Sequence, residues 1–256
     1  MTTVYPILLV HGIVFKDSRI FKAFGKIGKK LKESGLRVYV SRQDGFGKIE
    51  SNAAQLKAQI HDILNKENAK KINLIAHSKG GLDCKYLIKE LGMEDKVASL
   101  TTLCTPHRGS PVASRIMKLP KPVLKFVAFW INFWYKIFGD EHPDSYGVCK
   151  ELQRQDGVEE GAFSDKVYCQ SFSATMDRAK DDFIMSVPLA FSRRLESGDT
   201  DGLVPADSAK FANYRGSFNG SISHSQIAGF MVPEKKKEKV YSFYLDVCKE
   251  LADMNF

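Results

Sequence analysis

The stretch of the chain at residues 72–81 reads Ile-Asn-Leu-Ile-Ala-His-Ser-Lys-Gly-Gly. Its first five residues are mostly apolar, which is typical of a short buried strand. An amphipathic segment over residues 80–91 follows almost at once and indicates a helix. Ser78 therefore stands on a sharp turn between a strand and a helix.

A serine on such a turn has a strained backbone and a projecting hydroxyl, so the residues two positions before and after it must be small. Ala76 and Gly80 meet this demand, although Ala76 replaces the first glycine of the usual GxSxG pattern. The alternative interpretation is an ordinary N-cap serine followed by a glycine pair, because a short motif stays a hypothesis until its surroundings agree.

Outward from this turn, short apolar runs alternate with amphipathic stretches along the chain. This alternation predicts an α/β fold with a mostly parallel sheet flanked by helices. We expect strands at residues 5–10, 36–40, 72–76, 97–104 and 166–172. We expect helices at residues 20–31 and 80–91, and a third that begins at an N-cap on Ser51 and runs to residue 64. Loops are expected around residues 198–205 and 216–224. The 256 residues are within the size of one α/β domain, so we expect a single domain over 1–256.

The regular alternation breaks between about residues 111 and 160, where we expect a cap inserted into the domain. From Val123 to Phe138 only three residues are polar, and both tryptophans of the chain lie in this stretch. It is too short and too charged for a membrane span, which needs about 20 mostly apolar residues. We therefore do not expect a transmembrane protein.

The formal net charge of +8 raises the question of nucleic-acid binding. Lysines and arginines are scattered rather than clustered with recognition motifs, so we expect no nucleic-acid partner; a weak attraction to anionic lipid surfaces stays open. The five cysteines are odd in number and lack a CxxC pair, which argues against a disulfide framework. Because no signal peptide is visible, we expect a cytoplasmic protein or one released without such a peptide.

A serine hydroxyl is a poor nucleophile at neutral pH and needs an imidazole base, which in turn needs a carboxylate to orient it. When a serine follows a strand in this way, the chain order is serine, acid, histidine. Three histidines follow Ser78, namely His107, His142 and His224. We choose His224, which lies late in a polar loop before the last helix, and expect His107 to shape a turn and His142 to lie on the surface.

Residues 198–205, Gly-Asp-Thr-Asp-Gly-Leu-Val-Pro, offer two carboxylates upstream of this histidine. We choose Asp201 as the acid. Asp199 could instead cap the turn, and Asp207 could cap a following helix. Asp83 lies only five positions after the serine, within the expected helix, and is disfavoured.

The tetrahedral intermediate of acyl transfer also needs N–H donors where negative charge develops. The turn supplies the backbone N–H of Lys79. The second donor should follow an early strand, and Gly12 ends the first strand with a residue that lets the backbone approach closely. We assign the backbone N–H of Ile13 to this position and expect His11 to hold the loop rather than act as a second base.

Four motifs stand in order along the chain: VHGI at residues 10–13, AHSKGG at 76–81, TTLCTPHRGS at 101–110 and DGLV at 201–204. Together they resemble the bacterial triacylglycerol lipases of the α/β-hydrolase superfamily, over nearly the whole chain. The resemblance implies a Ser78, Asp201, His224 triad with Ile13 and Lys79 as the oxyanion hole. It agrees with the residues chosen above.

In that family a mobile helical lid follows the motif at 101–110 and covers an apolar acyl pocket. The aromatic stretch occupies this position, so we expect it to contact substrate and to touch a lipid interface transiently when open. The residues expected to do so are Phe126, Phe129, Trp130, Phe133 and Trp134. A merely buried core helix is the alternative.

Secreted members of the family often hold the histidine loop with calcium, through an aspartate two residues after the histidine. This chain has Gln226 there. Asp177, Asp181 and Asp182 lie upstream, but a hard cation would lack one charged ligand. We therefore expect no required metal or other cofactor.

The expected function is hydrolysis of carboxylic esters, with lipids such as triacylglycerols as the expected substrates, in lipid degradation. An acyltransferase is one alternative, in which an alcohol replaces water. A catalytically silent lipid-binding module of the same fold is another, because fold alone does not guarantee activity. Acyl-chain length and oligomeric state are not readable from the sequence.

Overall fold

The computed structural model describes residues 2–13, 23–153, 164–195 and 198–256. Within these residues, six strands form one parallel sheet in the order β2-β1-β3-β4-β5-β6. The strands are β1 (Ile7–Val10), β2 (Val38–Val40), β3 (Ile72–His77), β4 (Val97–Leu103), β5 (Tyr168–Thr175) and β6 (Asn213–Ser221). The fold class expected from the sequence, a mostly parallel sheet flanked by helices, is confirmed.

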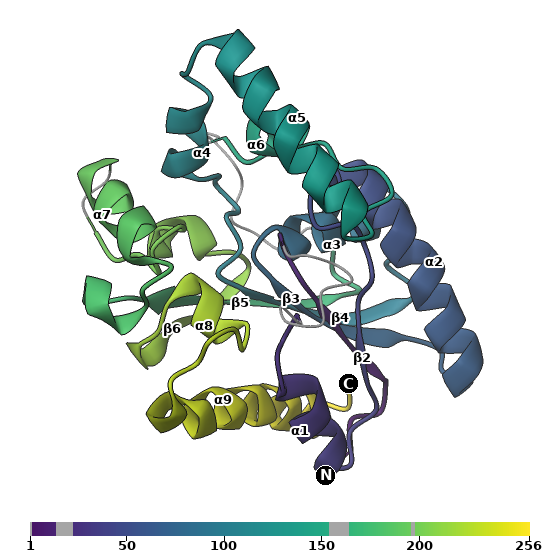
Figure 1. Ribbon diagram of the computed structural model, residues 1–256. Helices are drawn as coiled ribbons and strands as arrows, with labels where there is room; N and C mark the ends of the chain where they lie inside the picture. The colour runs from purple at the N-terminus through teal and green to yellow at the C-terminus, as the bar shows by residue number, and fades with distance from the viewer. Residues whose placement is uncertain (1, 14–22, 154–163, 196–197) are drawn as a thin grey trace.

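Helices cover both faces of this sheet, which explains why its inner strands read as continuous apolar runs. α1 (Ile27–Glu33) and α9 (Glu234–Asp253) lie on one face, and α2 (Ile49–Glu67) and α3 (Lys79–Lys89) lie on the other (Figure 1). Strand β1 shows the division, because successive side chains of a strand point to opposite faces. Ile7 and Leu9 pack with Tyr244 of α9, and Leu8 packs with Leu56 of α2.

The sheet has its switch point between β1 and β3. The chain passes from β1 outward to β2 and then returns to place β3 on the other side of β1. In open α/β sheets the crevice beyond the carboxyl ends of the strands at such a point is the usual ligand site. Gly12, two residues after β1, and Ser78, directly after β3, therefore lie where a site is expected.

Helices α4 (Pro111–Ile116), α5 (Lys121–Ile137) and α6 (Ser145–Glu151) connect β4 towards β5. They lie together at the opposite side of the molecule from α1 and α9 (Figure 1). This is the segment expected as a cap; its last residues, from 154 on, lie outside the described residues. In the described part of the chain, no helix is both long enough and apolar enough to cross a bilayer.

The C-terminal third carries the elements that the sequence analysis resolved least well. β6 was expected to be loop, and that prediction was wrong: it is an edge strand whose polar residues and positive-φ glycines Gly216 and Gly220 hide the alternation of a strand. The remaining short elements are η1 (Ala179–Asp181), α7 (Ser186–Leu195), η2 (Ala206–Ala209) and α8 (His224–Ile227).

Two helix boundaries also differ from expectation. α2 begins at Ile49 after Lys48, so Ser51 lies inside the helix and is not its N-cap. The first expected helix, 20–31, is described only from residue 23, and α1 begins at Ile27 after positive-φ residues Phe24 and Gly25. Helix ends depend on local hydrogen bonds that apolar spacing does not encode.

The buried hydroxyl of Tyr244 tests how α9 supports α8. It donates a hydrogen bond of 2.9 Å to the carbonyl oxygen of Ile227. Tyr244→Phe leaves that buried carbonyl without this donor, and we expect it to lower the free energy of unfolding by about 1 to 2 kcal/mol in urea denaturation. Tyr241→Phe, on the same helix but only partly buried, is the control; equal effects of the two substitutions would contradict the prediction.

Candidate active site

Ser78 stands on a strained turn between β3 and α3. Its backbone has φ 56° and ψ −134°, in the left-handed region that non-glycine residues rarely adopt. Gly80 permits this turn, because a Cβ there would lie 2.4 Å from the carbonyl oxygen of His11. Gly12 is equally restricted, since its Cβ would lie 2.7 Å from Cβ of Ser78. The loop after β1 therefore packs directly against the serine turn.

Three side chains from distant parts of the chain form one hydrogen-bonded series. The imidazole Nε2 of His224 lies 2.9 Å from Oγ of Ser78, and its Nδ1 lies 2.6 Å from Oδ2 of Asp201. Asp201 and His224 are buried, and Ser78 is half-buried. The backbone N–H of His224 also donates to the carbonyl oxygen of Asp201 at 2.9 Å, so both main chain and side chain hold this pair.

The surroundings of Asp201 keep its carboxylate charged. Burial by itself would raise the pKa of Asp201, but His224 and the backbone amides of Val204 and Leu203 lower it, and the net shift is downward. Those amides donate to Oδ1 at 2.8 and 2.9 Å. Oδ2 is thus the oxygen that accepts from the imidazole, as an orienting carboxylate requires.

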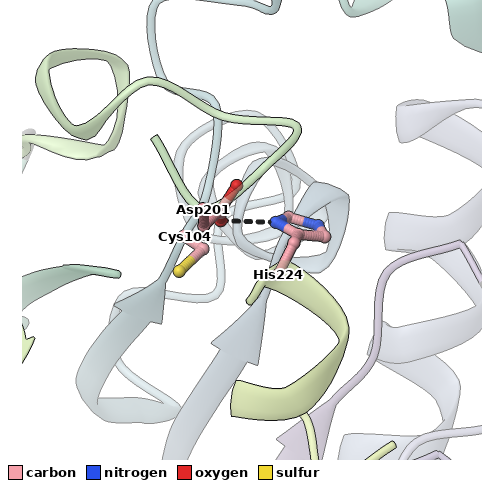
Figure 2. A group of neighbouring side chains, drawn as sticks. All are labelled: Cys104, Asp201 and His224. Atoms are coloured by element: carbon pink, nitrogen blue, oxygen red, sulfur yellow. Dashed lines mark hydrogen bonds and ion pairs between the residues drawn. The ribbon is translucent and has the colours of Figure 1, made fainter. Parts of the chain in front are cut away.

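Cys104 lies beside this pair at the end of β4 (Figure 2). One potential metal-ligand atom from each of Cys104, Asp201 and His224 lies within 4.8 Å of the others. Burial and the negative charge of Asp201 raise the pKa of the Cys104 thiol well above its usual value. A neutral thiol is a poor metal ligand, and His224 Nδ1 already bonds Asp201, so these residues are better suited to orienting the imidazole than to holding an ion.

His77 packs against the imidazole of His224, with ring centroids 4.6 Å apart. Burial, and after it the neighbouring His224, lower the pKa of His77 to about 3. His77 is therefore neutral at physiological pH. It fills the space beside His224 without adding a positive charge that would oppose protonation of that ring.

The two backbone donors assigned from the sequence lie on segments that touch. A Cβ on Gly12 would lie 3.2 Å from the backbone nitrogen of Lys79, so the chain that leads into Ile13 runs next to that amide. Ile13 is exposed and lines the cavity described below. Their function as an oxyanion hole stays a prediction.

The side chain of Lys79 is fully buried and was not singled out for its charge. Its Nζ lies 2.6 Å from Oδ1 of Asp83, one helical turn later. Asn52 of α2 donates to the other oxygen, Oδ2, at 3.1 Å. Burial raises the pKa of Asp83 to about 6, against the lowering effects of Lys79 and Asn52. The i,i+4 spacing in the sequence could have signalled this pair.

Two buried carboxylates, Asp44 and Asp140, link the loop after β2 to the segment that follows α5. Asp44 accepts from the backbone amides of Glu141 and His142, and Asp140 accepts from those of Gly45 and Phe46, at 2.7 to 2.9 Å. Such reciprocal side chain to backbone bonds leave no pattern in the sequence, which is why they were missed.

A mostly apolar cavity of about 450 Å³ opens beside Ser78. Its wall combines the two loops of the site with residues of the segment 184–185 and of the chain around α8. Its lining residues include Phe24, Tyr135, Ile184, Met185, Leu203 and Ser225. Its volume falls in the usual range of small-molecule sites, about 300 to 1,000 Å³.

The expected lid residues lie elsewhere. The side chains of Phe126, Phe129, Trp130, Phe133 and Trp134 are all exposed on α5, and the described wall of the cavity does not include them. Tyr135 of the same helix does line the cavity, packed against Phe46 with ring centroids 4.6 Å apart. A buried core helix is therefore excluded for this face, whereas lid motion stays a prediction.

The remaining candidates occupy supporting positions. His107 is buried, bonds Thr102 at 3.1 Å and stacks on Phe211, as expected of a turn residue. His142 is exposed. The Asp199 carbonyl oxygen accepts from the Ala206 amide, and Asp207 lies within η2, paired with Lys210. His11 holds its own loop through a bond of 2.8 Å to Gly12 O.

Gln226, which stands where a calcium ligand was sought, is buried and bonded within the protein. Its Nε2 donates to the carbonyl oxygen of Asp181 at 2.7 Å, and its Oε1 accepts from the amide of Ser223 at 3.4 Å. The side-chain amide of Gln226 thus connects the segment that carries His224 directly to η1. The absence of a metal requirement stays a prediction.

The family model of palmitoyl protein thioesterases matches residues 6–151, more than half of the chain. The chain belongs to the palmitoyl protein thioesterase family. The matched region includes β1, the serine turn and α5, but it ends before Asp201 and His224.

Curated relatives of the chain include triacylglycerol lipases. It is 27% identical to triacylglycerol lipase 2 of Saccharomyces cerevisiae over 90% of the chain and 73% of the relative. It is 36% identical to a triacylglycerol lipase of Pseudarthrobacter phenanthrenivorans over 46% of the chain, which spans only 38% of that relative. These homologues support a carboxylic-ester hydrolase, as the sequence predicted.

Solved structures agree on the fold. A metagenomic carboxyl esterase superposes with a TM-score of 0.70 at 18% identity, covering 88% of this chain and 66% of the esterase. A Bacillus licheniformis lipase in its mature form gives 0.60 at 21% identity, covering 86% and 84%. The expected α/β-hydrolase fold is confirmed.

The buried Lys79–Asp83 pair generates a test of stability. Lys79→Met leaves the buried Asp83 carboxylate without its cation, and we expect a loss of about 3 kcal/mol in the free energy of unfolding at pH 7. The double variant Lys79→Met/Asp83→Leu removes both charges and should regain most of that loss. Urea denaturation measures both, and a double variant no more stable than the single one would contradict the prediction.

Proposed function

We propose that the chain hydrolyses carboxylic esters of long apolar acyl groups, through an acyl-enzyme on Ser78. The observation that carries the proposal is the series Ser78–His224–Asp201, with bonds of 2.9 and 2.6 Å, beside an apolar cavity. A nucleophile, a base and an orienting carboxylate in this geometry are the elements of acyl transfer by a serine.

In the first step Oγ of Ser78 attacks the acyl carbonyl carbon while Nε2 of His224 accepts the hydroxyl proton. The charged Asp201 stabilises the imidazolium that forms. His224 then gives the proton to the leaving alcohol oxygen as the carbon–oxygen bond breaks. In the second step His224 takes a proton from water, whose oxygen attacks the acyl-enzyme, and returns it to Ser78 as the acid leaves.

The carbonyl oxygen becomes negative in both tetrahedral intermediates. We assign its stabilisation to the backbone N–H groups of Lys79 and Ile13, supported by the close packing of their segments. Loss of one such donor typically lowers the rate about 10²- to 10³-fold. Each of these steps uses groups of the chain and water alone, so we propose a reaction without a metal.

The apolar wall of the cavity favours an acyl chain over a polar group, because burying apolar surface stabilises a complex by about 25 cal/mol per Å². Phe24, Ile184 and Leu203 supply this surface. Lipids such as triacylglycerols fit this description, and the yeast relative is named for that activity. We propose triacylglycerols or related lipid esters as substrates.

Acyl thioesters are the second candidate. They present the same carbonyl to Ser78, and the family model that matches more than half of the chain is described by a thioesterase activity. Parallel assays of p-nitrophenyl palmitate and a palmitoyl thioester compare the two classes. A kcat/KM higher for the thioester would favour this second candidate.

The first test is an ester series from acetyl to palmitoyl, assayed in buffer with EDTA. We expect kcat/KM to rise with chain length as the cavity fills, and Ser78→Ala to lose at least about 10³-fold, because it removes the hydroxyl that is hydrogen-bonded to Nε2 of His224. Ser186→Ala, a half-buried serine at the start of α7, is the control. A Ser78→Ala variant that keeps full activity would rule out the mechanism, and a short-chain optimum would indicate a different ester class.

The exposed face of α5 supports a further proposal about access to lipid. Five large aromatic side chains on one exposed helix, with Lys121 and Lys125 at its start, have the composition of a helix that lies in a lipid interface. We propose that this face contacts the lipid surface during turnover.

Substitution of this face separates interfacial from chemical effects. We expect Phe129→Ser/Trp130→Ser to lower hydrolysis of an emulsified triacylglycerol about tenfold, because less apolar surface enters the lipid, and to leave hydrolysis of a dissolved butyryl ester within about twofold. Val4→Ser, which is also exposed but lies near the N-terminus, should change neither rate. Equal loss on both substrates would refute the interfacial contact.

A further inference from the structure

Asp182 has no assigned function, yet its carboxylate is buried close to the proposed site. It follows η1 and is 6% exposed. A buried carboxylate is costly unless it is paired or fully hydrogen-bonded. Among the described residues no lysine, arginine or histidine forms an ion pair with it; four N–H and O–H donors hold it instead.

One oxygen, Oδ2, accepts the hydroxyls on both sides of His224. The Oγ atoms of Ser223 and Ser225 each lie 2.5 Å from it and 3.2 Å from each other. Bonds between hydroxyls and a charged acceptor are shorter and stronger than neutral ones. Oδ2 of Asp182 therefore binds both Ser223 and Ser225, the residues on either side of His224.

The other oxygen, Oδ1, accepts from the wall of the cavity. The backbone amides of Ile184 and Met185 donate to it at 2.8 and 3.2 Å. Both residues line the cavity beside Ser78, as does Ser225. One carboxylate thus joins the segment that contacts the acyl chain to the segment that carries the base.

His224 needs such external support because its own helix is very short. α8 has four residues and cannot hold an orientation by its internal hydrogen bonds alone. Ser223 caps it by accepting from the amide of Gln226 at 3.2 Å, and the same Ser223 hydroxyl is the one that donates to Asp182. Oγ of Ser223 therefore both caps α8 and donates to Asp182. We call the hydrogen bonds that Asp182 accepts from Ser223, Ser225, Ile184 and Met185 the Asp182 clasp.

We propose that Asp182 is a positioning residue for His224, which holds the imidazole in line with Ser78 and ties it to the cavity wall at Ile184–Met185. This inference rests on the proposed function only for its kinetic readout. Asp182 does not touch the reacting atoms; it acts through Ser223 and Ser225. A base displaced by about 1 Å can slow a reaction roughly 100-fold.

Asp182→Asn tests the clasp with little change in size, and Ser225→Ala removes one arm of it. We expect kcat on a dissolved butyryl ester to fall about 10- to 100-fold in Asp182→Asn and less in Ser225→Ala, with KM within about threefold. Ser225→Thr keeps a hydroxyl and should restore most of the rate. Asp177→Asn, an exposed residue that loses the same charge nearby, is the control and should match wild type.

A second readout does not depend on turnover. The proton between His224 Nδ1 and Asp201 gives a far-downfield ¹H NMR resonance when the ring is fixed, and we expect Asp182→Asn to broaden or abolish it while circular dichroism stays unchanged. Should Asp182→Asn not fold, Ser225→Ala carries the same test.

The outcomes separate the two proposals. If the wild-type protein shows the resonance but hydrolyses no ester, loss of the resonance in Asp182→Asn would support the clasp and overturn the proposed function. An active enzyme whose Asp182→Asn and Ser225→Ala variants keep both kcat and the resonance would overturn the clasp. A fall in thermal stability with unchanged kcat and resonance would also overturn it, because Asp182 would then be merely structural.

Discussion

The backbone of residues 11–12 packs against that of residues 78–80 with no room for one added carbon. A Cβ at Gly80 or Gly12 would lie 2.4 or 2.7 Å from the facing chain, closer than real contacts allow. This constraint brings the ends of β1 and β3 together at the switch point of the sheet. It fixes the strained Ser78 and sets the amide of Lys79 beside the loop that leads to Ile13.

Around this contact, buried polar groups rather than apolar packing set the positions of the reactive side chains. Asp201 accepts from two amides and the imidazole, Asp83 accepts from Lys79 and Asn52, and Asp182 accepts from four donors. Each carboxylate connects two segments distant in sequence. Because an unmet buried donor or acceptor destabilises a fold by about 1 to 3 kcal/mol, such groups specify one arrangement of the loops.

The sequence predicted the sheet and the serine turn because both depend on local patterns. Apolar runs marked β1, β3 and β4, and the size restriction around Ser78 marked the turn. The choice of His224 and Asp201 followed from chain order. The structure places His224 within hydrogen-bond distance of Ser78, and Asp201 within hydrogen-bond distance of His224.

What the sequence did not predict depends on contacts between distant segments. β6 is an edge strand without apolar alternation, and the two hydroxyl partners of Asp182 are 41 and 43 residues away from it. The exposure of the α5 aromatics also depends on where the helix packs: Tyr135 and not Trp130 turns inward to the cavity. Helical spacing alone did not tell these faces apart.

In the proposed mechanism Ser78 carries the acyl group between the two steps. Mass spectrometry of the protein after rapid quenching with p-nitrophenyl palmitate tests it directly, because the acyl-enzyme adds the mass of one palmitoyl group. We expect this adduct on the tryptic peptide that contains Ser78. An adduct on another residue, or ester hydrolysis with no adduct trapped even in the slow Asp201→Asn variant, would contradict it.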